Sequence, residues 1–197
     1  ISKKTMRADI LEIINNNLSK KTKYNHLLRI AVNEKIISIS LRKRVKPKLN
    51  FNLKLVKLKR EKPEFKNLKY KKILSYLSKM DNSKSDIALV SNKRILETGT
   101  SNLLFVKNQK FFTPKKDYYE GNTYKFFKTK IKRIGKKDIL LKELNDYDEI
   151  LLIGSGKGVT SVRTINELNW KRKNLNKFKF LSNQYNVAIN ECDTYRF

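Results

Sequence analysis

Short apolar runs separated by pairs of turn-forming residues constrain this chain more than any other feature. Between residues 86 and 113, runs typical of β-strands alternate with breaks, and the pairs Asn92-Lys93 and Asn108-Gln109 fall between consecutive runs. Two residues of this kind favour the tight turn of a β-hairpin. The sequence therefore predicts antiparallel hairpins, with strands at residues 86–91, 95–98, 103–107 and 111–113.

Helical periodicity accounts for most of the remaining chain. Apolar residues recur at helical spacing in four segments, and further apolar runs are typical of strands. The predicted helices are residues 5–18, 68–80, 121–135 and 178–190, and the further predicted strands are 26–32, 36–41, 51–55 and 149–153. Pro63 interrupts the pattern after the strand at 51–55. We expect an α+β fold with a small lobe over residues 1–63 and a larger mixed lobe over residues 64–197.

The charge balance raises the question of a nucleic-acid partner. The 197 residues include 46 Lys and Arg against 18 Asp and Glu, a formal net charge of +28. Most of the basic residues are lysines spread over the whole length, and the run Lys54–Lys59 alternates lysine with apolar residues, as a half-buried strand does. No zinc-finger spacing, RNP-like motif or recognition-helix pattern is present. We therefore expect solvated lysine faces, and a basic nucleic-acid-binding protein stays the alternative from a different class.

Cysteine, histidine and hydropathy exclude other classes of protein. One cysteine, Cys192, cannot form a disulfide framework, and together with the single histidine, His26, it does not suggest a zinc site. Hydrophobic residues, at 39%, are too frequent for a disordered polycation. No apolar run approaches the roughly 20 residues of a transmembrane helix, and no signal-peptide pattern opens the chain. We expect a cytoplasmic protein without a metal site or a membrane contact.

Two segments present backbone N–H groups that an anion could bind. Gly121-Asn122-Thr123 opens a predicted helix, whose first amides lack partners within the helix and whose dipole favours negative charge there. Gly154-Ser155-Gly156 follows a predicted strand, and its glycines allow the backbone to aim amides inward. A P-loop is excluded, because it needs Gly at position 151 and Ser or Thr at position 158, where this chain has Leu151 and Gly158. Taken singly, the two segments are also compatible with an ordinary helix cap and an ordinary surface turn.

A carboxylate and a lysine are the candidate chemical groups. Glu97 ends an apolar strand and precedes the small residues Thr98–Ser101 at a bend. Such a carboxylate either bonds its own turn or is held against a basic nitrogen of a ligand. Lys66 lies just before a predicted helix, and spacing alone does not separate it from Lys69 or Lys71. The local sequence therefore leaves both roles open.

In their order along the chain, these segments resemble the class IV aminotransferases, the fold-type IV family of pyridoxal 5'-phosphate (PLP) enzymes. The family pattern starts with a Lys followed by a small or polar residue, Leu and often Tyr. About thirty residues later it has Glu, small residues, Ser-Asn and an aromatic strand, and then Thr-Pro, a Gly-x-Thr helix start and an apolar strand with a small-residue loop. The matching segments are Lys66–Tyr70, Glu97–Phe105, Thr113-Pro114, Gly121–Thr123 and Asp148–Val162. The resemblance covers about residues 63–166 and implies the fold-type IV fold.

The resemblance implies a role for each candidate residue. Lys66 would form the Schiff base with PLP and move protons, and burial in a cleft would favour its neutral form. Glu97 would pair with the pyridinium nitrogen, so that the ring acts as an electron sink. The residues that would bind the phosphate are Asn122, Thr123, Ser155 and Gly156. The two anion-binding segments thereby become two halves of one site.

The chain departs from the family pattern near its N-terminal end. The family carries a His-x-x-Arg motif whose Arg binds the phosphate, and His26-Leu27-Leu28-Arg29 copies it, but this copy lies too close to Lys66. We therefore expect either an N-terminally incomplete small lobe or a reduced member with weaker cofactor binding. Tyr124 and Ser161 stand where the family usually has Arg and Pro.

The activity implied by the resemblance is that of a PLP-dependent lyase or aminotransferase. The small size and the Lys-x-Leu-x-Tyr form favour 4-amino-4-deoxychorismate lyase, which eliminates pyruvate to give 4-aminobenzoate for folate biosynthesis. A branched-chain or D-amino-acid aminotransferase of the same family is the alternative. In either case the resemblance implies a small amino-acid-like substrate and a homodimer with sites near its interface.

Overall fold

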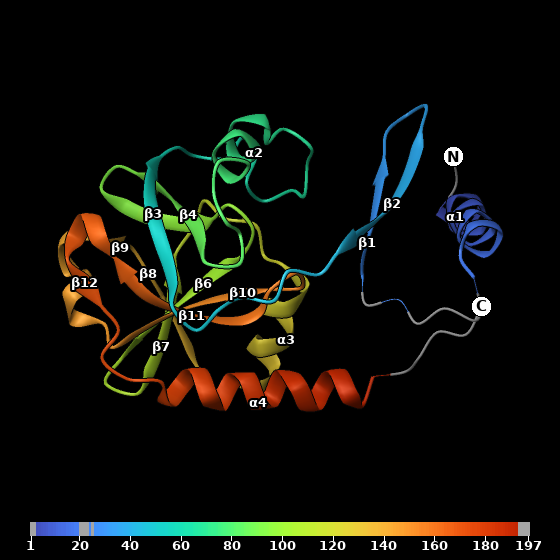
Figure 1. Cartoon of the computed structure of the whole chain (residues 1–197). Helices are drawn as coiled ribbons and strands as arrows, with labels where there is room; N and C mark the ends of the chain where they lie inside the picture. Colours follow the sequence, from blue (N-terminus) through green and yellow to red (C-terminus); the bar gives the residue numbers. More distant parts are fainter. Residues whose placement is uncertain (1–2, 20–23, 25, 193–197) are drawn as a thin grey trace. The chain divides into compact units, whose positions relative to one another are not determined.

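The computed structural model describes residues 3–19, 24 and 26–192, and Figure 1 shows its helices and strands. The chain divides into two compact units, a first one up to Arg44 that also takes in Glu191 and Cys192, and a second one from Val45 to Asn190. Both units contain helix and strand, which confirms the expected α+β class. Every candidate residue of the expected site lies in the second unit.

The first unit contains a helix and a β-hairpin. α1 spans Lys3–Asn17, and β1 (His26–Val32) pairs antiparallel with β2 (Ile37–Lys43). The Asn33 side chain closes the turn by accepting hydrogen bonds from two backbone N–H groups at 2.9 and 2.7 Å. The structure therefore has strands where the sequence predicts them, near residues 26–32 and 36–41, and pairs them as a hairpin.

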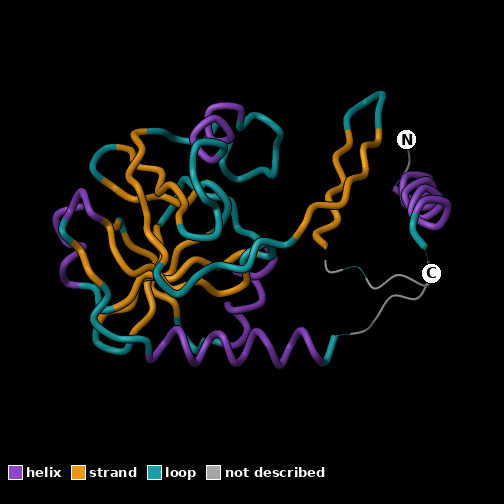
Figure 2. The backbone as a smooth tube through the Cα atoms, viewed as in Figure 1, coloured by secondary structure: helices purple, strands orange, loops and turns teal. Residues whose placement is uncertain are grey.

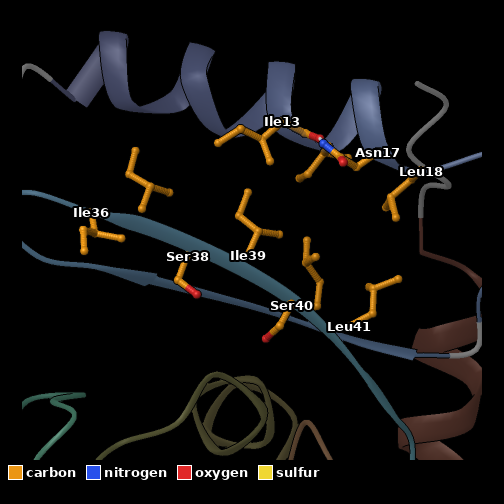
Figure 3. Close-up of a pocket in the computed structure, with 11 residues that line it drawn as sticks. Ile13, Asn17, Leu18, Ile36, Ser38, Ile39, Ser40 and Leu41 are labelled. Carbon is orange, nitrogen blue, oxygen red and sulfur yellow. The ribbon is translucent and has the colours of Figure 1, made fainter.

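One face of this hairpin is mostly apolar, with the pair His26–Lys43 at its open end. The cross-strand pairs Leu28–Leu41, Ile30–Ile39 and Val32–Ile37 share it, because alternate residues of a strand lie on one face. A groove of about 570 Å³ is lined by residues of this hairpin and of α1, and Figure 3 shows Ile13 of α1 opposite Ile39. Apolar side chains thus line both sides of the groove within the first unit.

In the described part of the chain, the second unit is built on one large mixed sheet. Its strands are β3 (Phe51–Lys57), β4 (Ser85–Ser91), β5 (Arg94–Thr98), β6 (Asn102–Lys107), β7 (Lys110–Pro114), β8 (Ile134–Lys137), β9 (Ile139–Leu140), β10 (Glu149–Gly154), β11 (Gly158–Ile165) and β12 (Trp170–Lys171). Neighbouring strands run in the order β8-β7-β6-β10-β11-β3-β4-β5-β9, and β12 pairs with β11. The pairs β11–β3, β3–β4 and β7–β8 are parallel. The β10–β11 hairpin therefore joins the two halves of the sheet.

Two hairpins of this sheet turn at the predicted residue pairs. Asn92 and Lys93 join β4 to β5, Asn108 and Gln109 join β6 to β7, and all four have φ between 49° and 63°. Positive φ at both positions is the geometry of a two-residue turn of type I′. The loop between β5 and β6, which follows Glu97, lies at the other end of these strands.

Alternation along the strands divides the core into an inner and an outer part. Phe51, Val90, Ile95, Phe105 and Leu152 belong to one buried cluster, although their strands occupy distant places in the sheet. The sheet is therefore strongly curved, as Figure 2 shows, and it encloses this inner cluster. Residues at the alternate positions point outward, where the helices cover them.

Three helices cover the outer side of the sheet. α2 (Lys71–Leu77) packs on β4, whereas α3 (Asn122–Lys130) and α4 (Asn176–Asn190) pack near β10 and lie on the opposite side in Figure 1. The buried Glu149 of β10 fixes the start of α4, because its carboxylate accepts two N–H groups of the first turn at 2.7 and 2.9 Å. None of the helices in the described residues is both long enough and apolar enough to cross a membrane.

The structure corrects the sequence predictions at several places. The predicted helix 121–135 ends at Lys130, because residues 134–137 pair in parallel with β7 as the strand β8. The predicted helix 68–80 is shorter, with seven residues in α2. The sequence does not predict the strand β11, which pairs on both of its sides. The boundary expected at residue 63 falls inside the second unit, since β3 pairs with β4 and β11 in the large sheet.

Candidate active site

The first anion-binding segment lies where α3 begins. Gly121 is the N-cap residue, no described side chain caps the helix, and the Lys125 N–H donates the first helical hydrogen bond to the Gly121 carbonyl at 3.0 Å. The N–H groups before Lys125 therefore face outward at the helix end, where the helix dipole favours an anion. Thr123 is buried there and Asn122 is exposed. The start of α3 has the form expected of one half of a phosphate site.

A buried asparagine fixes the position of this helix start. Asn102 is 4% exposed, and its side-chain amide donates a hydrogen bond to the Tyr119 carbonyl and accepts one from the Gly121 N–H at 3.0 Å. A Cβ atom at position 121 would lie 3.0 Å from the Asn102 Oδ1 atom, so glycine allows this close approach. Asn102 thus shapes the loop that leads into α3.

The second anion-binding segment is the turn of the β10–β11 hairpin. Residues Ser155–Lys157 connect Gly154 to Gly158, which pair at the end of the ladder. The Thr123 Oγ1 and Ser155 Oγ atoms lie 3.2 Å apart and share a hydrogen bond. The structure therefore brings the two segments into direct contact.

Glu97 is buried near the end of β5 and has two partners. Its Oε1 atom accepts a hydrogen bond from the Arg60 Nε atom at 2.8 Å, and its Oε2 atom accepts one from the Tyr119 N–H at 3.4 Å. Burial raises the pKa of Glu97 above its ordinary value, and the Arg60 guanidinium acts in the opposite direction. The sequence does not single out Arg60, because nothing separates it from the other basic residues of Lys57–Lys62.

Lys66 lies in the loop between β3 and α2, and it is exposed. Its Nζ atom lies 6.0 Å from the centroid of the Tyr119 ring. The loop is held by contacts of its own, such as the hydrogen bond from the Asn67 amide to the Glu61 carbonyl at 2.9 Å. The expectation of a buried Lys66 is therefore wrong for this structure, and no contact in the described residues joins Lys66 to Glu97 directly.

Tyr119 connects the candidate residues to one another. Its ring faces Lys66, its N–H binds Glu97, and its carbonyl accepts from Asn102. Two residues later, Gly121 opens α3. Lys66, Glu97 and the two anion-binding segments are thus linked through residues 119–123.

Together, these N–H groups, hydroxyls, carboxylate and amine fit a ligand that carries a phosphate, a basic ring nitrogen and a carbonyl carbon. Helix-end N–H groups and the hydroxyls of Thr123 and Ser155 suit the phosphate. The carboxylate of Glu97 suits a cationic ring nitrogen, and the amine of Lys66 suits a carbonyl carbon.

Comparison with known families identifies the class of this protein. The sequence model of the family described as amino-transferase class IV matches residues 2–165. This match covers most of the chain, so the chain belongs to the class IV aminotransferase family, whose members are PLP-dependent enzymes. The family, fold and cofactor expected from the motifs are confirmed. No curated protein matches the chain.

Solved structures share this fold at low sequence identity. The branched-chain aminotransferase from Thermoproteus uzoniensis is 14% identical with a TM-score of 0.74, over 96% of this chain and 72% of that protein. The 4-amino-4-deoxychorismate lyase from Pseudomonas aeruginosa is 18% identical with a TM-score of 0.62, over 83% and 68%. A hypothetical aminotransferase from Mycobacterium tuberculosis in its PLP-bound form is 16% identical with a TM-score of 0.56, over 71% and 56%. The chain therefore spans between 56% and 72% of the length of these three proteins.

Proposed function

We propose that this chain binds PLP between its two anion-binding segments and Glu97, with Lys66 as the covalent attachment. The residues at the phosphate are Asn122, Thr123, Ser155 and Gly156. The observation that carries the proposal is the hydrogen bond between the hydroxyls of Thr123 and Ser155. It joins a helix end to a glycine turn, and each of these presents N–H groups to an anion. Because the two segments are adjacent, both can bind one phosphate.

Each residue has a defined task in this proposal. When bound, PLP supplies an electron sink for the carbon that bears the amino group of the substrate. Lys66 would hold the cofactor covalently, and its amine would take the proton from that carbon. Glu97 supplies negative charge at the ring nitrogen, and Arg60 favours the ionised form of Glu97 against the effect of burial.

Within the family, we propose the activity of a 4-amino-4-deoxychorismate lyase. Lys66 removes the proton from the ring carbon that carries the amino group, the C–O bond to the enolpyruvyl group breaks, and the ring becomes aromatic as 4-aminobenzoate. The enolpyruvate that leaves gains a proton and becomes pyruvate. The fold shared with the Pseudomonas aeruginosa lyase and the Lys66–Tyr70 segment support this activity. The higher TM-score of the Thermoproteus uzoniensis enzyme supports a branched-chain aminotransferase as the second candidate.

Cofactor binding is tested by absorbance titration of the purified chain with PLP. We expect a band for the covalent linkage in the wild type and its loss in Lys66→Ala. Lys69→Ala is the matched control, because Lys69 is an exposed lysine of the same loop, and it should keep the band. A band that persists in Lys66→Ala would refute the role of Lys66, and a wild type without a band would refute the PLP site.

The reaction is tested with 4-amino-4-deoxychorismate in the presence of PLP. A lyase releases pyruvate from this substrate without any amino acceptor. An aminotransferase instead converts a branched-chain amino acid, the amino donor, only when a keto acid is added as the acceptor. If this second reaction is the one observed, the aminotransferase is the correct activity. Lys66→Ala should abolish either reaction.

We also propose a homodimer whose interface lies near Lys66. Phe65 and Leu68 flank Lys66 and are 61% and 55% exposed, so the loop presents apolar surface beside the proposed site. Sedimentation should give twice the mass of the chain, and Phe65→Ser with Leu68→Ser should shift it toward the monomer. A monomeric wild type would refute this part of the proposal.

A further inference from the structure

Asp86 and Lys157 form an ion pair in the interior of the second unit. The Lys157 Nζ atom lies 3.0 Å from the Asp86 Oδ2 atom, and their side chains are 6% and 0% exposed. The ammonium also lies 4.9 Å from the centroid of the buried Phe51 ring, a cation–π contact. Apolar residues of similar volume often stabilise a fold as well as a buried ion pair does, because both charges lose their hydration. Global stability therefore does not explain why the pair occupies this place.

Lys157 belongs to the turn that we propose to hold the phosphate. It follows Ser155 and Gly156 and precedes Gly158, whose φ is 65°. On one side the turn is attached to α3 through the contact of Ser155 with Thr123. On the other side it is attached to Asp86 through the Lys157 ammonium. The lysine is directed into the protein interior and anchors the turn there.

Asp86 also holds the loop that follows Glu97. Its Oδ2 atom accepts hydrogen bonds from the hydroxyls of Thr98 and Thr100 at 3.1 and 2.5 Å, in addition to the bond from Lys157. Its Oδ1 atom accepts the N–H of the next residue of β4 at 2.8 Å. One carboxylate thus connects β4, the loop after Glu97 and the hairpin turn.

The loop and the turn also touch each other directly. A Cβ atom at position 154 would lie 2.7 Å from the Ser101 Oγ atom and 3.4 Å from the Thr100 carbonyl oxygen. Glycine at 154 therefore lets the start of the turn lie against the loop. The place of Ser155 relative to Glu97 depends on this packing and on the bonds of Asp86.

We infer that Asp86 and Lys157 are positioning residues for the phosphate end of the cofactor, because their ion pair holds the turn Ser155–Lys157 in a fixed place relative to Glu97. This role rests on the PLP site proposed above, since Asp86 and Lys157 affect the cofactor only through Ser155 and Gly156. Lys157 does not contact the phosphate in this arrangement, since its ammonium is paired with Asp86. It acts through the geometry of Ser155 and Gly156.

The test compares the affinity for PLP with the affinity for pyridoxal, which lacks the phosphate. Lys157→Met keeps an unbranched apolar chain against Phe51, and the double variant with Asp86→Asn leaves no buried charge without a partner. By absorbance titration we expect the Kd for PLP to rise about tenfold in both variants, while the Kd for pyridoxal changes less than about twofold. Inorganic phosphate should also compete with PLP less effectively in the variants. Lys171→Met, at an exposed lysine of β12, is the matched control and should keep both affinities.

The outcomes separate a positioning role from a merely structural one. An equal loss of both affinities, or a lower melting temperature with an unchanged Kd for PLP, would overturn the inference. Lys157→Arg keeps the charge and should restore most of the PLP affinity, and the double variant serves if Lys157→Met does not fold. A wild type that binds PLP no better than pyridoxal contradicts the proposed phosphate site itself, whereas wild-type preference for PLP that survives in the double variant contradicts only the role of Asp86 and Lys157.

Discussion

Replacing Asn102 by alanine tests how the loop before α3 is held in place. The Asn102 side chain bonds the Tyr119 carbonyl and the Gly121 N–H from a buried position. Alanine removes both bonds and leaves two backbone groups without their partner, each at a cost of about 1–3 kcal/mol. Because residues 119 and 121 are half-buried, water reaches these groups in part, and the lower part of the range applies to each. We therefore expect Asn102→Ala to lower the free energy of unfolding by about 2–4 kcal/mol.

Urea unfolding measures this change directly, and thermal unfolding gives a second measure. For a domain of this size, a loss of about 2–4 kcal/mol lowers the Tm by about 5–15 °C. Asn102→Asp is a second variant, which tests the donor function of the Asn102 amide separately from its acceptor function. Its carboxylate still accepts the Gly121 N–H, but its second oxygen replaces the donor and repels the Tyr119 carbonyl oxygen at close range, so near pH 7 the aspartate variant should lose at least as much stability as the alanine variant. Asn183→Ala, at an exposed position of α4, is the control and should stay within about 0.5 kcal/mol.

The same substitution should affect the cofactor site. If Asn102 holds Tyr119 and Gly121, Asn102→Ala should weaken PLP binding in the absorbance titration as well as stability. A change in unfolding free energy below about 0.5 kcal/mol would refute the proposed role of Asn102. It would mean that the Tyr119 carbonyl and the Gly121 N–H lose no stability when their hydrogen-bond partner is removed. An aspartate variant as stable as the wild type would refute it too, since the donor to Tyr119 would then contribute nothing.

Four further substitutions follow from the structure, each measured by urea unfolding. Arg60→Met leaves the buried Glu97 without its cation and should cost about 3–5 kcal/mol at pH 7; a loss under about 1 kcal/mol would contradict the pairing. Glu97→Gln removes an acid whose pKa burial raises in the folded state above the ordinary 4.5, so the folded wild type binds this proton more tightly than the unfolded chain does. The wild type should then gain stability relative to this variant as the pH falls from neutral to about 4.5, and parallel stability curves would contradict the expectation. Gly158→Ala places alanine at a φ of 65° with its Cβ 2.9 Å from a Tyr185 ring carbon, and it should cost about 1–3 kcal/mol, whereas an unchanged free energy of unfolding would mean that the turn tolerates a side chain. Phe127→Ala empties a fully buried site beneath α3 and should cost about 3–5 kcal/mol, and a smaller loss would mean that the neighbouring side chains close the cavity.

The elements of this fold could largely be predicted where the signal is local. The pairs Asn92-Lys93 and Asn108-Gln109 specify their turns by their own backbone preferences, so the hairpins were predictable from a few residues. The strand β3 looks in sequence like the third strand of the small lobe, but its partners are β4 and β11, and β11 lies about a hundred residues further along the chain. Residues 131–135 continue a helical pattern, yet Ile134 and Gly135 pair with β7 as part of a strand. Strand pairing between residues that are far apart in the sequence cannot be predicted from the local pattern of apolar and polar residues.

The candidate site divides in the same way. The helix start at Gly121 and the turn at Ser155 were predictable, because a helix end and a glycine turn expose N–H groups by local geometry. Arg60 and Lys157 were not, since a buried basic residue has no sequence signature among 46 Lys and Arg residues. The only local sign of Asp86 is that this charged residue directly precedes an apolar run, which is a weak indication of a buried carboxylate. Its role depends on partners from two distant segments.

The position of the β10–β11 hairpin has a consequence for the synthesis of the chain on the ribosome. Because these two strands lie between β6 and β3, the sheet consists of two separate pieces until residue 165 has been made, and each piece has an open edge. At about 5–20 residues per second, β3 waits about 5–20 s for its partner β11. An open edge can pair with other chains during that time. The nascent chain therefore acquires the proposed phosphate turn at the same step that closes its sheet.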